Sequence, residues 1–189
     1  MFANVYNRKY WLRYLKQSKS ELGQKIYQER WKIISRYLDK GTLLDYGCGP
    51  GAFNAAGGDE FQKFGYDINP HCGFKYYPDH EWDAVTFWDS LEHIPNFYSL
   101  IRTLNPKWLF IATPNLESVR HDVLKWKHYR PDEHIYYFDR HSLKIILKSL
   151  GYFIREINFT EGQLRDPQQP EAVMTVVAEK VDHASISKE

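Results

Sequence analysis

The sequence predicts an α/β fold built on a mostly parallel sheet that helices cover on both faces. Short apolar runs alternate with segments of helical periodicity, which is the pattern of parallel strands joined by helices. A turn rich in glycine directly follows the first of these runs. The length of 189 residues leaves room for one core and little else.

Two helical segments precede the first expected strand. Their residues recur at helical spacing: Tyr6, Tyr10 and Tyr14 in the first, and Leu22, Ile26, Ile33 and Tyr37 in the second. Four expected strands follow, at residues 42–46, 63–66, 82–87 and 107–112. A helix from Asn96 to Leu104 lies between the last two and ends at Asn105-Pro106.

The last part of the chain predicts one helix and two strands. An apolar stripe marks the helix, formed by Leu143, Ile146, Leu147 and Leu150. Asp139 is the expected N-cap of this helix, and Gly151 is its expected end. Residues 152–159 and 172–178 are expected strands, joined by a polar loop that contains proline. This hairpin adds one antiparallel strand to the sheet.

The most informative stretch, LLDYGCGPGAF, covers residues 43–53. It has the pattern of a buried strand that ends at an acid, Asp45, and turns through Gly47, Gly49 and Gly51. Glycine is favoured where the backbone has a positive φ or comes within contact distance of a ligand. Because ligands of open α/β sheets bind at the carboxyl ends of the strands, this turn predicts a ligand that contains a nucleoside.

Two ligands fit this loop, and a purely structural glycine turn is a third possibility. A dinucleotide fingerprint matches, because Gly47, Gly49 and Ala52 occupy its three positions. Asp67, twenty residues after Gly47, then stands where that fingerprint needs an acid. Asp45, however, would place a carboxylate beside the pyrophosphate. An acid there favours a cationic ligand without phosphate, such as S-adenosylmethionine, which carries a sulfonium and an ammonium group.

Five stretches, in order along the chain, resemble the motifs of class I S-adenosylmethionine-dependent methyltransferases. They are LLDYGCGPGAF (43–53), FGYDINP (64–70), EWDAVTFWDSLEHIPN (81–96), LFIATPN (109–115) and EHIYYFDRHSLKIILKSLGY (133–152). The LEH turn in the third stretch is similar to the ubiquinone-biosynthesis-like branch, methyltransferase type 11/23. The resemblance implies a Rossmann-like, doubly wound, mostly parallel sheet of seven strands with an antiparallel last strand. This domain would cover residues 41–182, followed by a frayed tail at 183–189.

The chain departs from this pattern after the second strand. Fourteen residues separate Asp67 from Trp82, and Pro70, Gly73 and Pro78 interrupt them. A crossover between parallel strands usually needs about a dozen residues besides the strand that follows. We therefore expect the helix and the third strand of the family to be shortened or absent.

The resemblance implies S-adenosylmethionine as cofactor and an in-line transfer of its methyl group. It places Asp45 near the methionine end of the donor and the backbone of Gly47, Cys48 and Gly49 against its body. Asp67 is expected to accept hydrogen bonds from the ribose hydroxyls. The other expected cofactor-binding residues are Gly51, Ile68, Trp88, Asp89 and Ser90.

Two of the eight histidines are candidates for a general base that accepts the proton of an acceptor hydroxyl. His93 lies in the Leu91-Glu92-His93 turn, and His134 begins the segment that resembles the late histidine motif of the family. Each is alternatively a structural histidine bonded to a loop carbonyl. Five other histidines lie in polar stretches and are expected at the surface: His71, His80, His121, His128 and His141. No histidine pair has metal-ligand spacing with an acid or cysteine partner, so the sequence predicts no metal.

Composition argues against a secreted or membrane-embedded protein. The two cysteines, Cys48 and Cys72, give no disulfide framework. No apolar run approaches membrane-spanning length, and no secretory segment follows the N-terminus. We therefore expect a cytoplasmic protein without a membrane partner.

The nature of the acceptor is the most open question. Residues 1–40 hold ten Lys and Arg against three acids, whereas residues 41–119 hold four against ten. The resemblance implies that residues 1–40 form an N-terminal helical substrate cap, together with the segment 119–134. Both segments are basic and aromatic, which suits stacking on a ring or holding phosphate. Alternatively, the aromatic side chains face the core and the charges are solvated.

Three functional hypotheses remain. The favoured one is methyl transfer to a small-molecule or sugar-nucleotide acceptor, at oxygen. The second is an RNA or DNA methyltransferase that uses the basic N-terminal segment. The turn Trp88-Asp89-Ser90-Leu91 argues against it, because it lacks the Asn/Asp-Pro-Pro-aromatic signature of amino methyltransferases. The third is a non-catalytic protein that binds S-adenosylmethionine.

Overall fold

The computed structural model describes residues 7–74, 77, 79–119 and 122–181, and these contain one six-stranded sheet. The strands are β1 (Gly41–Tyr46), β2 (Phe61–Tyr66), β3 (Ala84–Trp88), β4 (Trp108–Pro114), β5 (Tyr152–Asn158) and β6 (Val173–Lys180). Their order is β2-β1-β3-β4-β6-β5, with β6 antiparallel to both neighbours and the other pairs parallel. The predicted α/β class and the antiparallel last strand are therefore confirmed.

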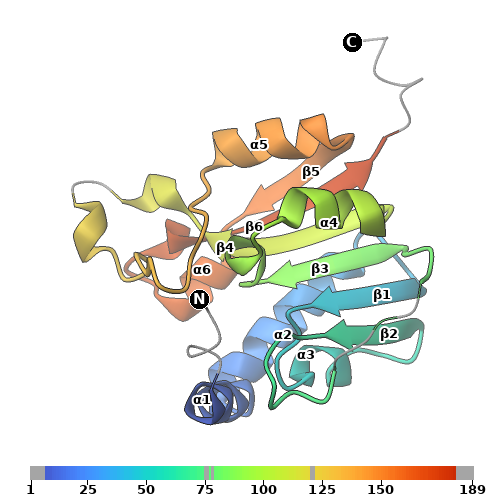
Figure 1. The fold of residues 1–189 in the computed structure, drawn as a ribbon, viewed down its shortest axis with the longest axis horizontal. Coiled ribbons are helices and arrows are strands. Elements are labelled where there is room, and N and C mark those ends of the chain that lie inside the picture. Colours follow the sequence, from blue (N-terminus) through green and yellow to red (C-terminus); the bar gives the residue numbers. More distant parts are fainter. Residues whose placement is uncertain (1–6, 75–76, 78, 120–121, 182–189) are drawn as a thin grey trace.

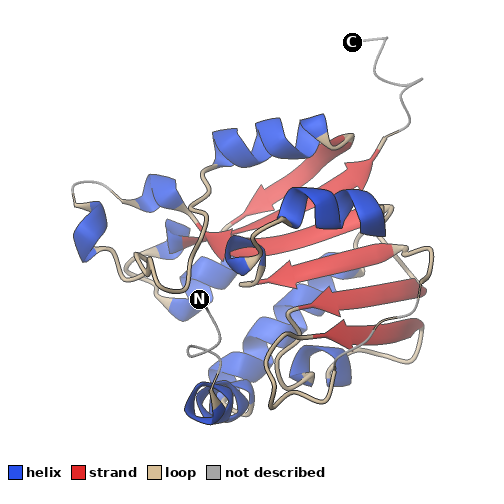
Figure 2. Cartoon of the chain, viewed as in Figure 1, coloured by secondary structure: helices blue, strands red, loops and turns tan. Residues whose placement is uncertain are grey.

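Helices cover both faces of this sheet, so the fold has three layers (Figures 1 and 2). On one face, α4 (Phe97–Leu104) and α5 (Arg140–Ser149) pack on the core cluster that contains Val85, Phe87, Leu109 and Ile111. On the other face, α2 (Glu21–Ile34) and α3 (Ala52–Ala55) pack on a second cluster, which contains Ala84, Trp88, Trp108 and Phe110. Successive residues of β3 and β4 thus alternate between the two cores, as expected for strands buried on both faces.

The connection after β2 is as short as the sequence predicted. In the described part of residues 67–83 there is no helix or strand, and β1 pairs directly with both β2 and β3. The sheet of the described residues therefore has six strands, and the seventh strand of the family pattern is not among them.

The ends of α4 and α5 lie where the local sequence signals predict them. The Asp139 carboxylate accepts a hydrogen bond from Ser142 N at 2.6 Å and forms a capping box at the start of α5. Asn105 ends α4 in the left-handed conformation, with φ +44°. Gly151 has φ +83° directly after α5, where glycine is favoured. Tyr6, His121 and the predicted tail at 183–189 lie outside the described residues.

The loop predicted between the last two strands is instead partly helical. It contains α6 (Thr160–Arg165), which begins after Phe159 without a side-chain cap. A Cβ on Gly162 would lie 2.0 Å from the carbonyl oxygen of Pro170, so this short helix is pressed against the following turn. Six residues are too few to show a helical period in the sequence, and tertiary contacts hold the element. None of the described helices has the length and apolar character that a membrane span requires.

Candidate functional site

A cavity of about 630 Å³ opens at the carboxyl ends of β1, β3 and β4. It is lined by Asp45 and the turn after β1, by residues 88–95 after β3, and by Pro114 at the end of β4. Helix α1 (Arg8–Ser18) contributes Tyr10, Arg13 and Tyr14. All the predicted site residues line this cavity except Gly51. The fold therefore brings these residues together at one edge of the sheet, and their roles stay predictions.

The surroundings of the three glycines in the turn differ, so a side chain would have a different effect at each position. A Cβ on Gly47 would lie 2.4 Å from Ser90 Cβ, and Gly47 has φ +91°. A Cβ on Gly51 would lie 2.6 Å from the Phe74 ring. At Gly49, in contrast, a Cβ would meet nothing within 4 Å, and φ is +51°. Two glycines thus serve close packing, and Gly49 alone of the three leaves open space for a ligand. Gly51 packs against Phe74 and does not line the cavity, so its expected contact with the cofactor stays a prediction.

The backbone amides of this turn are already used within the protein. Gly47 N and Cys48 N donate to the carbonyl oxygen of Tyr66, at 2.7 and 3.0 Å. Gly49 N donates to Asp67 Oδ2 at 2.7 Å, and Gly51 N donates to Cys48 O at 2.9 Å. A pyrophosphate site needs such amides to point at the phosphates, with a helix N-terminus behind them. Because α3 has four residues and these amides are engaged, the geometry disfavours the dinucleotide alternative.

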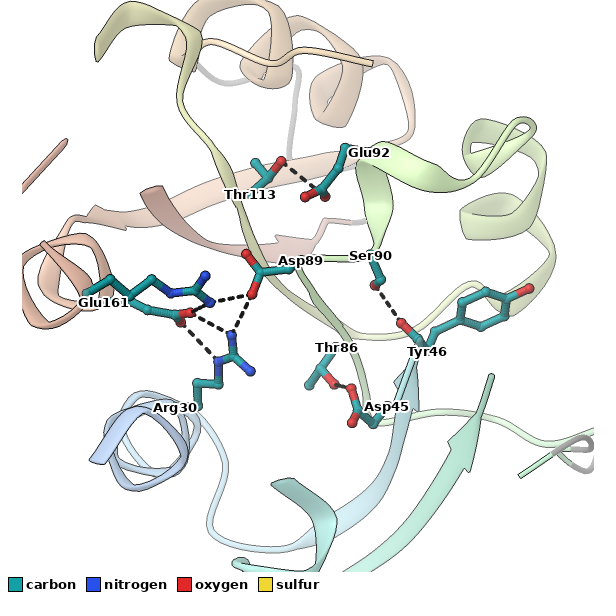
Figure 3. Close-up of polar contacts among 10 residues, drawn as sticks. Arg30, Asp45, Tyr46, Thr86, Asp89, Ser90, Glu92, Thr113 and Glu161 are labelled. Atoms are coloured by element: carbon teal, nitrogen blue, oxygen red, sulfur yellow. Dashed lines mark hydrogen bonds and ion pairs between the residues drawn. The ribbon is translucent and has the colours of Figure 1, made fainter. Parts of the chain in front are cut away.

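Two carboxylates flank the turn. Asp45 is 2% exposed, and its Oδ1 accepts a hydrogen bond from Thr86 Oγ1 at 2.8 Å (Figure 3). Burial raises the pKa of Asp45 to about 7, so a cationic ligand beside it would favour the ionised form. Asp67 lies at the end of β2, and its Oδ1 accepts from Asn69 N at 2.7 Å. Each carboxylate oxygen has a second lone pair, which leaves Asp67 able to accept hydrogen bonds from a bound diol.

Other predicted cofactor residues occupy the wall and the rim of the cavity. Ser90 Oγ donates to the carbonyl oxygen of Tyr46 at 2.6 Å, which fixes the turn after β3 against the turn after β1 (Figure 3). Trp88 is 6% exposed, and the Arg30 guanidinium lies over its ring at 4.7 Å. Cys48 is buried, whereas Ile68 is 70% exposed on the rim of the cavity.

A buried ionic network joins the N-terminal helices to the site, and the sequence did not reveal it. Arg30 of α2 donates to Glu161 of α6 through Nε and Nη2, at 3.0 and 2.6 Å, and to Asp89 Oδ2 at 3.1 Å. Arg165 of α6 also pairs with Asp89 and Glu161. Figure 3 shows Asp89 between the pair of Arg30 and Glu161 on one side and Ser90 on the other. Asp89 has φ +52°, an uncommon conformation for a residue other than glycine, and these arginines hold its side chain. They also hold the pKa of Asp89 below its usual range, despite burial.

A second polar cluster lies on the other side of Asp89 and consists of Glu92, His93 and His134. Each of the three offers a ligand-type atom, and these atoms lie within 4.8 Å of one another. The two imidazole rings meet edge to face, with centroids 4.7 Å apart. Burial raises the pKa of Glu92 to about 8 and lowers the pKa of His134 to about 4. Burial lowers the pKa of His93 as well, so both imidazoles are neutral at pH 7.

Two sequence-based statements about histidines require correction. His128 was expected at the surface, but it is half-buried and lines the cavity, where burial lowers its pKa to about 4. The prediction of no metal rested on spacing along the chain. The fold instead brings His134 beside Glu92 and His93 from forty residues away, so that argument does not hold. His71, His80 and His141 are exposed, as predicted.

Aromatic residues of the N-terminal segment divide between the cavity and the core. Tyr10 and Tyr14 of α1 line the cavity, with ring centroids 4.6 Å apart and the Arg13 guanidinium 5.1 Å from each ring. Trp31 of α2 is instead a core residue that stacks on Phe53 at 4.8 Å. The core-facing alternative therefore holds for Trp31, whereas stacking of Tyr10 and Tyr14 on an acceptor stays a prediction.

Comparison with known proteins adds the family. Residues 10–157 match the family described as a methyltransferase domain. No curated protein sequence matches the chain. The fold is similar to a SAM dependent methyltransferase from Archaeoglobus fulgidus, with TM-score 0.65 and 18% identity over 90% of this chain and 100% of that chain.

Two further solved structures have the same fold. One is magnesium protoporphyrin IX methyltransferase (ChlM) from Synechocystis PCC 6803 with bound SAH, with TM-score 0.64 and 13% identity over 95% of this chain and 98% of that chain. The other is the small RNA methyltransferase HEN1, with TM-score 0.59 and 19% identity over 87% of this chain and 26% of that chain. At these identities the likeness establishes the fold and leaves the acceptor open.

Proposed function

Because the chain belongs to the family of methyltransferase domains, we propose that it transfers the methyl group of S-adenosylmethionine to an oxygen of a small-molecule or nucleotide-linked acceptor. One observation carries this proposal. A single cavity is lined both by the turn at Asp45 and Gly49 and by the cluster of Glu92, His93 and His134. The first group suits the donor, and the second suits an acceptor hydroxyl.

The donor side fits S-adenosylmethionine by charge and by space. When bound, this donor supplies a methyl group that is already activated by a sulfonium. Asp45 offers a buried carboxylate for the cationic end, and the open side of Gly49 leaves room for the body of the ligand. Asp67 lines the same cavity, and we expect it to accept hydrogen bonds from the ribose hydroxyls. The electrostatic attraction between a carboxylate and a cation is stronger in a buried site than in water, because the local dielectric constant is low.

The acceptor side is suited to a hydroxyl. A hydroxyl loses its proton as its oxygen bonds to carbon, so it gains from a group that favours this loss. Glu92, His93 and His134 line the same cavity as the glycine turn, and their ligand atoms lie within 4.8 Å of one another. A cavity of about 630 Å³ must hold donor and acceptor together, which favours a small acceptor or a single group that reaches in from outside.

Calorimetry with S-adenosylhomocysteine tests the donor assignment. We expect one ligand per chain, and we expect Asp67→Ala to weaken binding about tenfold or more, because hydrogen bonds to a charged acceptor are lost. Asp79→Ala is the matched control, since Asp79 is exposed and does not line the cavity. Failure of the native protein to bind either S-adenosylhomocysteine or S-adenosylmethionine would overturn the proposal.

A nucleic-acid acceptor is the second candidate, favoured by the exposed cations of α1. Arg8, Lys9, Arg13 and Lys16 are exposed on this helix, next to the mouth of the cavity. Binding of a mixed-sequence oligonucleotide whose affinity falls steeply with salt would support this candidate. Salt-independent or absent binding would leave the small-molecule acceptor.

A further inference from the structure

We propose that Glu92, His93 and His134 bind a divalent transition-metal ion on the acceptor side of the cavity. The site depends on these side chains alone, whereas the role of the ion in methyl transfer rests on the proposed function.

The three side chains form a compact donor set. One carboxylate oxygen and two ring nitrogens lie within 4.8 Å of one another. Ligand atoms around a tetrahedral ion are about 3.3 Å apart when metal–ligand distances are about 2.0–2.1 Å. Small side-chain adjustments therefore suffice to close the set around an ion. All three residues line the cavity, so an ion there would keep open positions toward it.

The hydrogen bond of His93 leaves one of its ring nitrogens suited to coordinate an ion. His93 Nδ1 lies 2.8 Å from the carbonyl oxygen of Glu133. A carbonyl only accepts, so Nδ1 carries the proton and Nε2 keeps its lone pair for an ion. This arrangement, a ligand histidine that donates its other N–H to a carbonyl, is the usual support of metal-binding imidazoles.

The two other members are buried without the partners that their chemistry requires. His134 is 7% exposed, and its buried Nδ1 has no hydrogen-bond partner among the described residues. Glu92 is 1% exposed, accepts from Thr113 Oγ1 at 3.3 Å, and forms no ion pair with any described Lys or Arg. Buried polar groups are normally paired, and buried charges pair with opposite charge or coordinate metal. A cation at this position would favour the ionised form of Glu92 and would accept a lone pair from an imidazole nitrogen of His134.

The backbone holds the ligands in place across forty residues. Ile135 N and Tyr136 N both donate to the carbonyl oxygen of Glu92, at 2.9 and 3.2 Å. Together with the contact from His93 to Glu133, these bonds clamp the turn after β3 to the segment that carries His134. Preorganised ligands bind an ion with less loss of side-chain entropy. This clamp would have little purpose for a surface loop.

The donor set selects the class of ion. Two imidazoles with one carboxylate suit zinc, manganese, iron or cobalt, whereas magnesium and calcium prefer oxygen ligands. Three protein ligands with open positions are typical of catalytic sites, and four protein ligands of structural ones. An acceptor hydroxyl in an open position loses its proton to water more readily. Its oxygen then forms the bond to the methyl carbon as the carbon–sulfur bond breaks. In this arrangement His93 and His134 hold the ion and do not themselves act as bases.

Binding of Co²⁺ to the full chain, after treatment with a chelator, tests the proposal without reference to activity. We expect one equivalent per chain by calorimetry, together with visible absorption bands of Co²⁺ bound to nitrogen and oxygen ligands. Glu92→Gln, His93→Gln and His134→Gln should each weaken binding at least about tenfold. His141→Gln is the matched control, because His141 is exposed on α5 and outside the cavity.

S-adenosylhomocysteine binding, measured on the same variants, shows that each is folded and separates the two proposals. If Co²⁺ does not bind, or binds equally well to all three variants, the metal site is wrong even though S-adenosylhomocysteine binds. If Co²⁺ binds as expected but S-adenosylhomocysteine does not, the metal site stands and the proposed function falls. Where one variant fails to fold, the other two decide.

Discussion

The proposed donor side and the proposed acceptor side of the cavity are assembled in different ways. The donor side depends on one turn directly after β1, and on Asp67 at the end of the neighbouring strand. The acceptor side joins residues that are far apart in the sequence. Arg30 pairs with Glu161, and the backbone at Glu92 is bonded to residues 135 and 136. A contiguous turn can be recognised from its residues, whereas a site built from distant segments exists only once the sheet has formed.

The largest expected effect comes from the network that joins the two ends of the chain. Glu161→Ala leaves Arg30, which is 6% exposed, with Asp89 as its remaining ion-pair partner among the described residues. Removing one partner of a buried pair typically costs about 3–5 kcal/mol of unfolding free energy. Urea denaturation measures this loss. Glu29→Ala, which removes a partly exposed pair with Lys32, should change little. Equal effects of both changes would contradict the structural role of the network.

Gly47 and Gly49 provide a matched pair on the donor side. Gly47→Ala places a Cβ 2.4 Å from Ser90 Cβ at φ +91°, and we expect about 1–3 kcal/mol of lost stability. Gly49→Ala meets no atom within 4 Å, so its stability cost should be the smaller one. Its Cβ would enter the space assigned to the donor, and S-adenosylhomocysteine affinity should fall. Thermal denaturation and calorimetry separate the two effects. An unchanged affinity in Gly49→Ala would show that the donor does not bind against this turn.

The raised pKa of Asp45 predicts a pH dependence of stability. Its native pKa is about 7, whereas its unfolded value is near 3.9, so the native state binds more protons between these values. Stability contributed by this group therefore falls as pH rises from about 4 to 7, by up to about 1.4 kcal/mol per pH unit. Asp45→Asn removes this dependence. Unfolding free energies of both proteins across this pH range should diverge in favour of the variant, and parallel curves would contradict the assignment.

The smallest expected effect concerns α1. Arg13→Gln removes a guanidinium that lies over Tyr10 and Tyr14, and exposed contacts of this kind are worth about 0.5–1 kcal/mol. We expect little change in thermal midpoint and no change in S-adenosylhomocysteine affinity. A loss of oligonucleotide binding in this variant would assign α1 to acceptor recognition. A loss of donor binding would instead show that α1 contributes to the donor site, and the two proposed sides would then share this helix.

The sequence predicted most elements with local signals of their own. The strands, the Asp139 cap and the end of α4 at Asn105 follow from patterns within a few residues, and the structure confirms them. The class I methyltransferase assignment is confirmed by the family match and the fold, whereas the ubiquinone-biosynthesis-like branch stays a prediction. The separate cap over residues 1–40 also stays a prediction, although Trp31 of α2 packs in the core.

What the sequence missed depends on distance along the chain. Helix α6 is held by contacts with α2 rather than by its own periodicity, so six residues of ambiguous propensity gave no signal. His128 is flanked by charged and polar residues in the sequence, but the cavity buries it. Glu92 belongs to the LEH turn in the sequence. Its burial beside two imidazoles depends on the fold, because His134 comes from a distant segment.

The sequence by itself determined the class of fold, the cofactor of the family, and a set of candidate residues that the fold gathers at one edge of the sheet. These follow from alternation of elements and from a turn in which acid and glycines are neighbours. Only the tertiary structure decided why each glycine is required, which arginines hold Asp89, and that Glu92, His93 and His134 form one cluster. The physical reason is that packing distances and burial depend on segments that the chain brings together only when it folds.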